Sequence, residues 1–224
     1  MLLAVDTATQ TASLALYEET KGRVLGEESW VSINNHTVEL MPRLARLFDQ
    51  QQIAPKTLTG LVASLGPGSF TGLRIGLSVL KGLAVARKVP LVGIPTLDVV
   101  ARPHMTQSLP IWAILQAGRG RICAGLYVPH KGRWRRSGET QLTTLEELCK
   151  QVTEPVLFCG ELDHRDAKRI RGILNIETSV VTPAAALRRA AFLAELGWER
   201  LARGDSDDPA TLSPIYLQNP QIDG

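Results

Sequence analysis

The chain has 224 residues, with 25 Lys and Arg against 22 Asp and Glu. A net charge of +3 argues against a protein that coats a polyanion, and 44% hydrophobic residues argue against intrinsic disorder. No apolar run reaches the roughly 18 residues of a membrane span, and no signal-peptide pattern is found. Three cysteines without CxxC spacing indicate neither a disulfide framework nor a zinc site, so a cytoplasmic protein is expected.

The first hundred residues alternate between short apolar runs and amphipathic stretches. Apolar runs bounded by turn residues predict strands at residues 2–5, 12–17, 24–33, 61–65 and 91–94. Helical spacing of apolar side chains predicts helices over 37–52, 72–88 and 96–102. Asn34 or Asn35 is placed to cap the first of these helices, and Ser69 or Thr71 the second. This order predicts an α/β layer.

The second half repeats the order of strands and helices less regularly. Predicted strands cover 111–116, 121–128, a segment near Trp134, and 156–159. Predicted helices cover 145–152 and 183–203, the latter with Pro183 in its first turn and Gly204 beyond its end. We therefore expect two similar lobes, one formed by residues 1–105 and completed by 205–224, and a smaller one formed by 106–204.

A turn rich in small hydroxyl residues follows the first strand. Its polar side chains include Asp6, Thr7, Thr9 and Ser13. Such a turn can offer N–H groups and hydroxyls to a phosphate, with Asp6 placed to orient a metal-bound water. The alternative is an ordinary solvent-exposed hairpin turn capped by threonines, which is the more common use of such residues.

A glycine-rich segment, residues 66–72, lies between a predicted strand and a predicted helix. Gly66, Gly68, Ser69 and Thr71 stand where the N–H groups of a helix N-terminus favour an anion. The segment is neither a P-loop nor GxGxxG, since no Gly-Lys-Ser/Thr follows and the glycines fall at the wrong spacing. The alternative is a tight turn that needs glycine for its backbone conformation. The pattern alone does not decide between them.

The sequence gives little support for a hydrolase. The four histidines fall in no HExxH or HxxxH frame, and GxSxG is absent around Ser69. Cys123 and Cys159 lie in predicted strands, which indicates core residues and not nucleophiles.

A basic segment, residues 130–136, reads His-Lys-Gly-Arg-Trp-Arg-Arg. Its cations could contact phosphates and its tryptophan could stack on a base. The more common use of such a segment is to guard the edge of a sheet by charge.

Several segments together resemble the TsaB (YeaZ) family of bacterial tRNA threonylcarbamoyladenosine biosynthesis proteins. The most specific is the run Gly-Pro-Gly-Ser-Phe-Thr-Gly-Leu-Arg-Ile-Gly at 66–76. The others are residues 3–9, His36-Thr37 with 40–42, 93–97, and Pro-Ile-Tyr-Leu at 214–217. The resemblance is strong over residues 1–100 and looser beyond.

The resemblance implies an ASKHA fold, the two-lobed α/β architecture of actin, Hsp70 and sugar kinases, each lobe with a mixed sheet and flanking helices. It also implies a non-catalytic scaffold that pairs with the related subunit TsaD and with the ATPase TsaE. That complex transfers a threonylcarbamoyl group from its adenylate to N6 of adenosine 37 in tRNAs reading ANN codons. The chain alone is expected to have no activity, no metal and no cofactor of its own; ATP or ADP at the partner interface is left open. The tRNA is expected to be reached through the complex.

The family's partner surface is carried by the helices near 37–52 and 72–88. A homodimer through the same helices is the expected form without TsaD. Gly72 and Gly76, one turn apart, would permit close approach of another helix. The alternative is that both helices only cover the local sheet. The expected contact residues are His36, Leu40, Met41, Leu44, Gly72, Leu73, Gly76 and Leu80.

Two departures weaken the case for catalysis in the second lobe. Where the family often has Asp-Ala-Arg, this chain has Gln116-Ala117-Gly118, and Arg121 reverses a charge. A glutamine cannot act as a carboxylate base or as an equally strong metal ligand. The alternatives kept beside the scaffold are a small ASKHA ATPase or kinase with Asp6 as its base, and, less favoured, an M22-type peptidase.

Overall fold

The computed structural model describes residues 1–33, 35–174, 176 and 178–217. The chain divides into two compact units, the first made of Met1–Val99 with Arg189–Tyr216 and the second built mainly from Val100–Arg188. The return to the first unit thus comes at residue 189 and not at 205, because the last helix packs on the sheet of the first unit. Residues 218–224, assigned to the first lobe from the sequence, lie outside the described part.

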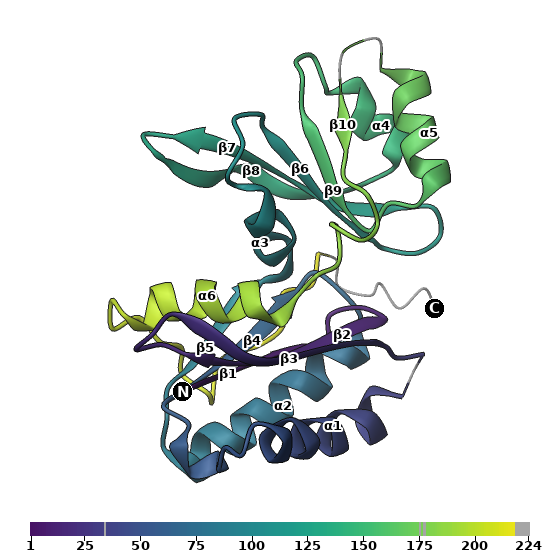
Figure 1. Ribbon diagram of the computed structural model, residues 1–224. Helices are drawn as coiled ribbons and strands as arrows, with labels where there is room; N and C mark the ends of the chain where they lie inside the picture. The colour runs from purple at the N-terminus through teal and green to yellow at the C-terminus, as the bar shows by residue number, and fades with distance from the viewer. Residues whose placement is uncertain (34, 175, 177, 218–224) are drawn as a thin grey trace. The chain divides into compact units, whose positions relative to one another are not determined.

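The first unit is built on a five-stranded mixed sheet (Figure 1). Its strands, in the order β3-β2-β1-β4-β5, are β1 (Leu2–Asp6), β2 (Thr11–Glu18), β3 (Arg23–Val31), β4 (Gly60–Gly66) and β5 (Leu91–Pro95). β1 runs antiparallel to β2 and parallel to β4. β1 and β4 are buried along their whole length, as expected for central strands covered on both faces.

Helices cover both faces of this sheet (Figure 1). On one face lie α1 (His36–Gln50) and α2 (Phe70–Arg87), whose apolar stripes pack on Leu3, Val5 and the other side chains of that face. On the opposite face lies α6 (Ala190–Leu201), against Leu2, Ala4 and Val62. The alternation of side chains along a strand sends neighbours to opposite faces, so both cores are specified by the same strands.

The second unit is built on another five-stranded sheet, in the order β10-β9-β6-β7-β8. Its strands are β6 (Ile111–Gln116), β7 (Ile122–His130), β8 (Arg133–Thr143), β9 (Leu157–Gly160) and β10 (Ser179–Val180). The helices α4 (Leu145–Lys150) and α5 (His164–Ile173) share a core with this sheet that includes the fully buried Phe158. The remaining helices are α3 (Thr96–Ala101) and two short 3-10 helices, η1 (Pro55–Thr57) and η2 (Arg102–His104).

One predicted helix is corrected, and one helix was not predicted. The helix predicted over 183–203 begins only at Ala190, because its start is set by a distant side chain: Glu27 Oε1 accepts from Ala191 N at 2.9 Å and Glu27 also pairs with Arg189. The helix α5 was not predicted from the sequence, although Asp163 and Asp166 form a capping box at its start.

At the N-terminus of α2, Ser69 is the capping residue, its Oγ accepting from Gly72 N. Asn35 precedes α1 without a side-chain capping bond, and Asn34 lies outside the described residues. None of the helices within the described ranges combines the length and hydropathy that crossing a bilayer requires.

Candidate functional site

The hydroxyl-rich turn after β1 and the glycine-rich segment before α2 pack on each other. Ser69 N donates to the Ala8 carbonyl at 2.6 Å, and Thr7 Oγ1 donates to the Gly72 carbonyl at 2.7 Å. A Cβ at Gly68 would lie 2.2 Å from the Ala8 carbonyl oxygen. Two loops separated by about sixty residues are therefore joined into one structural unit, which the sequence pattern did not show.

The glycines of α2 make this contact possible. A Cβ at Gly72 would lie 2.2 Å from the Thr7 carbonyl oxygen, and one at Gly76 would lie 2.3 Å from Thr7 Oγ1. The expectation that Gly72 and Gly76 form the seat for a partner's helix is corrected: both face the turn after β1. The close approach is between this helix and Thr7 of the same unit.

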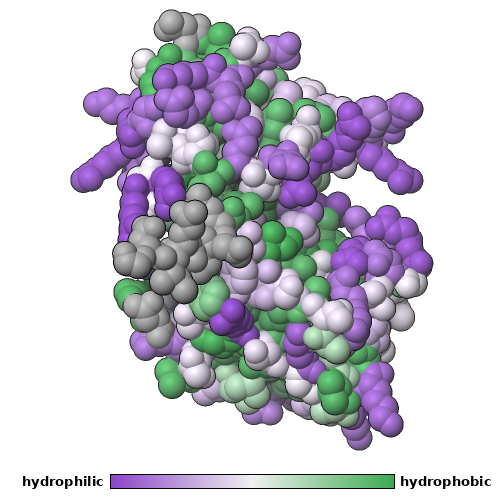
Figure 2. Space-filling view, turned by 180° about the vertical axis from the view of Figure 1, so that it is seen from behind, coloured by the Kyte–Doolittle hydropathy of each residue, from purple (hydrophilic) through white to green (hydrophobic). Residues whose placement is uncertain are grey.

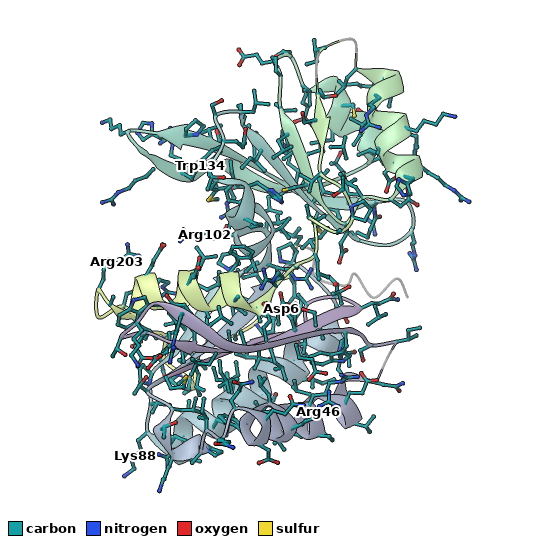
Figure 3. The ribbon with its side chains drawn as sticks, viewed as in Figure 1. Asp6, Arg46, Lys88, Arg102, Trp134 and Arg203 are labelled. Atoms are coloured by element: carbon teal, nitrogen blue, oxygen red, sulfur yellow. The ribbon has the colours of Figure 1, made fainter. Side chains whose placement is uncertain are left out.

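Asp6, at the end of β1 (Figure 3), has an internal role. Its side chain is fully buried, and its Oδ1 accepts from Ala8 N and from Ser64 Oγ, each at 2.9 Å. These contacts hold the turn against β4. Because the carboxylate is enclosed and hydrogen-bonded, it is not placed to act as a base on a bound substrate.

The other residues expected to bind phosphate divide by burial. Thr7, Ser13 and Gly66 are buried, while Thr9 is half-buried and Gly68, Ser69 and Thr71 are exposed. Of the N–H groups at the start of α2, those of Ser69 and Gly72 already have partners in the protein. An anion that used the Ser69 N–H would have to displace the Ala8 carbonyl.

The residues expected to contact a partner lie mostly inside the unit. Leu44, Leu73 and Leu80 are buried in the core beneath the helices. His36, Gly72 and Gly76 are buried at the turn after β1. Only Met41 is exposed, with 49% of its surface accessible. The apolar stripe chosen from the sequence is therefore the stripe that faces the sheet.

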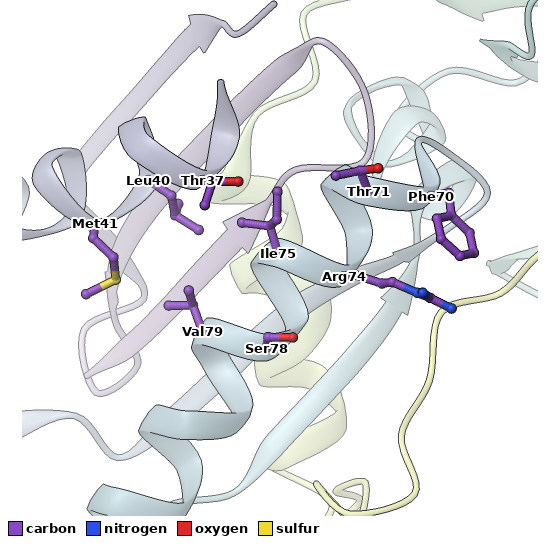
Figure 4. Close-up of a pocket in the computed structure, with 9 residues that line it drawn as sticks. All are labelled: Thr37, Leu40, Met41, Phe70, Thr71, Arg74, Ile75, Ser78 and Val79. Atoms are coloured by element: carbon purple, nitrogen blue, oxygen red, sulfur yellow. The ribbon is translucent and has the colours of Figure 1, made fainter. Parts of the chain in front are cut away.

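The outer faces of α1 and α2 enclose a groove of about 460 Å³ (Figure 4). Its lining is Thr37, Leu40, Met41, Phe70, Thr71, Arg74, Ile75, Ser78 and Val79. Leu40 is buried and forms part of the lining from below, while Met41 and Phe70 are about half exposed. Arg74 is the only charged side chain in this lining. The groove could have been found from the sequence, because a second and weaker apolar stripe lies one position along each helix from the stripe that faces the sheet. Met41 on α1 and Ile75 on α2 belong to this second stripe.

Arg74 is held in place by two aromatic rings. Its guanidinium carbon lies 3.7 Å from the Phe70 ring centroid, and its Nε donates to Tyr216 Oη at 3.1 Å. The rings of Phe70 and Tyr216 are 5.1 Å apart. Tyr216 is brought here because Ile215 N donates to the Leu65 carbonyl at 2.7 Å. The Pro-Ile-Tyr-Leu segment thus fixes one end of the groove.

The cysteines and Gln116 give no support to a nucleophile or base. All three cysteines are buried, and burial raises the pKa of the Cys123 thiol to about 11 and also raises the pKa of Cys149 and Cys159. Gln116 Nε2 donates to the Glu161 carbonyl at 2.8 Å. Within the described residues, no group of three or more His, Cys, Asp or Glu side chains is arranged to hold a metal ion.

His36, at the start of α1, should make stability depend on pH. Burial lowers its pKa, against the opposing effects of a hydrogen bond to the Thr9 backbone and the charges of Glu39 and Asp6. Between the folded and the unfolded pKa of His36, the unfolded chain is protonated at this histidine and the folded chain is not. The free energy of unfolding should therefore fall as the pH drops through about 6.5, and it should level off below the folded pKa.

Urea midpoints measured between pH 7.5 and 5.5 check this expectation. His104, whose pKa burial also lowers, contributes in the same direction. His36→Gln and His104→Gln, measured separately, should each flatten part of the decline. A midpoint that rises on acidification in this range would contradict the assignment.

Comparison with known proteins identifies first the fold and then the family of this chain. A chain of the PilM–PilN type IV pilus biogenesis complex shares the fold, with a TM-score of 0.53 at 9% identity over 83% of this chain and 89% of that one. Two mixed sheets with flanking helices, together with this likeness, show that the chain has the ASKHA fold.

Sequence relatives are more specific. The family model for TsaD, tRNA N6-adenosine threonylcarbamoyltransferase, matches residues 24–168. The tRNA threonylcarbamoyladenosine biosynthesis protein TsaB of Bacillus subtilis is 31% identical over 97% of this chain and 93% of its own length. YeaZ from Pseudomonas aeruginosa superposes with a TM-score of 0.79 at 25% identity, covering 96% of this chain and 99% of that one. The chain belongs to the TsaB (YeaZ) family, within the wider TsaD family.

Proposed function

We propose that this chain is a non-catalytic scaffold subunit in the formation of N6-threonylcarbamoyladenosine at position 37 of tRNA. It acts by pairing with TsaD, in an assembly that TsaE joins. The observation that carries the proposal is the groove between α1 and α2, an exposed and nearly uncharged surface in a family named for this modification.

The chemistry of the groove suits a helical partner. Apolar and small polar side chains from two adjacent helices form ridges with a hollow between them, the shape into which the side-chain ridge of another helix fits. Val38 on α1 and Val85 on α2 are exposed to 69% and 73% and extend the apolar character beyond the groove. An apolar surface of this kind is unusual on a protein that works alone. Two copies of the chain would pair through the same surface in the absence of TsaD.

The potentially reactive side chains of this chain are poorly placed for catalysis, which supports a scaffold role. Asp6, the candidate base of an ATPase or kinase, is enclosed and braces the turn after β1. The buried thiols have raised pKa values and are poor nucleophiles at neutral pH. TsaD is therefore the subunit that we expect to make the new bond.

Reconstitution tests the proposal. TsaD and TsaE, supplied with threonylcarbamoyl-adenylate and a tRNA that reads an ANN codon, should modify it at least about 100-fold more slowly without this chain than with it. Modification at the full rate by TsaD and TsaE alone would contradict the scaffold role. So would ATP hydrolysis by the isolated chain at a rate that Asp6→Asn abolishes.

A further inference from the structure

The positive charge of this chain is concentrated in the second unit. Residues 100–188 contain 13 Lys and Arg against 8 Asp and Glu, whereas the residues of the first unit contain 12 against 13. Four of the 13 cations, Lys131, Arg133, Arg135 and Arg136, lie within six consecutive residues that include no acid. The proposed partner surface on the first unit does not use them.

These four cations lie at the end of a projecting two-stranded ribbon formed by β7 and β8 (Figure 1). β6 pairs with β7 only as far as Tyr127, so the last three residues of β7 pair with β8 alone. The ribbon ends in a two-residue turn at Lys131 and Gly132, both with positive φ, as in a tight hairpin. Trp134 is labelled on this ribbon in Figure 3.

The strand register distributes the arginines over the ribbon. Because side chains alternate along a strand, Arg133 and Arg135 share one face, and Trp134 and Arg136 share the other. His130, directly opposite Arg133, adds an imidazole to the first face. The ribbon is thus cationic on both faces, with a half-buried aromatic ring on one of them.

These cations are available to a ligand. Lys131, Arg133, Arg135 and Arg136 are all exposed, and none of them forms an ion pair with another described residue. Arg136 makes one hydrogen bond, to Thr140 Oγ1 at 3.1 Å. Figure 2 shows long hydrophilic side chains standing out at the upper right, where this ribbon lies in that view.

The distribution of charge does not fit the guarding of a sheet edge. Guarding cations would be spread along the open edge of β8, but residues 137–143 contain no Lys or Arg and one Glu. The charge is gathered instead where the ribbon extends past the rest of the sheet. Closely spaced arginines on a projecting element match the closely spaced charges of a nucleic-acid backbone, to which guanidinium groups bind in a bidentate manner.

We propose that the end of the β7–β8 ribbon, residues 130–136, binds the phosphate backbone of RNA. The proposal rests on the function proposed above for the choice of RNA, since a subunit of a tRNA-modifying assembly meets tRNA as its polyanion. It adds a direct contact with tRNA to a chain that otherwise acts through TsaD.

Binding of a tRNA transcript by the full-length chain, measured by fluorescence anisotropy over a series of salt concentrations, tests the proposal. The variant with Arg133→Gln, Arg135→Gln and Arg136→Gln should bind about tenfold or more weakly at about 100 mM salt. The slope of log K against log salt should become shallower by about 2, because the counterions displaced by these contacts are no longer released.

Two matched variants make the result specific. Arg165→Gln, Lys168→Gln and Arg171→Gln remove the same charge from exposed positions of α5 and should leave affinity within about twofold. Replacing the three ribbon arginines by lysine keeps the charge and should retain most of the salt slope. Equal losses in the ribbon and α5 variants, or no loss in the ribbon variant, would overturn the proposal.

Two further measurements distinguish RNA binding from binding to an anionic membrane and from pairing with TsaD. Phosphatidylglycerol vesicles should not bind at the salt concentration where tRNA does; vesicle binding that depends on the ribbon, with tRNA binding unchanged, would overturn the proposal in favour of a membrane surface. The ribbon variant should still co-elute with TsaD in the absence of RNA. A wild-type chain that binds tRNA through the ribbon but fails to pair with TsaD would refute the scaffold function and leave this contact standing.

Discussion

Met41→Glu is expected to weaken binding of the chain to TsaD by at least about 100-fold without lowering its stability. Met41 lines the groove between α1 and α2 and is 49% exposed, so a glutamate is tolerated in the free chain. In the complex the carboxylate would be buried against another helix with Arg74 as the only cation in the groove lining. Burying an unpaired charge in an interface costs several kcal/mol.

Titration calorimetry with TsaD measures this affinity directly. Gln50→Glu adds the same charge to an exposed position at the end of α1, outside the groove, and should change the affinity by less than about threefold. Ser78→Arg, on the α2 side, should repeat the effect of Met41→Glu. Unchanged affinity in both groove variants would contradict this choice of interface.

Gly72→Ala is expected to destabilise the chain by about 2–4 kcal/mol. The new methyl group would lie 2.2 Å from the Thr7 carbonyl oxygen, so either α2 or the turn after β1 has to move. Such a movement also breaks the hydrogen bond from Thr7 Oγ1 to the Gly72 carbonyl. Overpacking against a rigid backbone and loss of a buried hydrogen bond together give a penalty of this size.

Gly82→Ala on the same helix is the matched control. A Cβ at Gly82 would meet no atom within 4 Å, so the substitution should stabilise the chain by about 0.5–1 kcal/mol through helix propensity alone. Urea unfolding of the two variants beside the wild type measures both effects. Equal effects of the same sign would show that the contact with Thr7 does not explain Gly72.

Substitutions at the buried positions of α1 and α2 would measure folding and not binding to a partner. Leu40→Asp would place a charge at a position that is 1% exposed and packed in the core, and Gly76→Arg would collide with Thr7. Both should unfold the chain before any effect on pairing can be measured. The exposed positions of the groove are therefore the ones that separate binding from folding.

The order of elements in the first unit followed from the sequence with little error. β1 to β5, α1 and α2 lie within a few residues of their predicted positions, because apolar periodicity and turn residues act locally. The error came at α6, whose start is set by Glu27, 164 residues from the amide that it accepts from. When a side chain on a distant strand caps a helix, the sequence around the start of that helix does not show it.

Sequence by itself therefore determined the fold class, the family and the two helices that carry the groove. Only the tertiary structure decided which face of each helix is open and what the glycine motif does. The reason is that burial and close approach depend on pairs distant along the chain: Thr7 with Gly72, 65 residues apart, and Arg74 with Tyr216, 142 residues apart. A periodic pattern indicates that a helix has an apolar stripe, but the neighbours brought by folding decide whether that stripe meets the sheet or a partner.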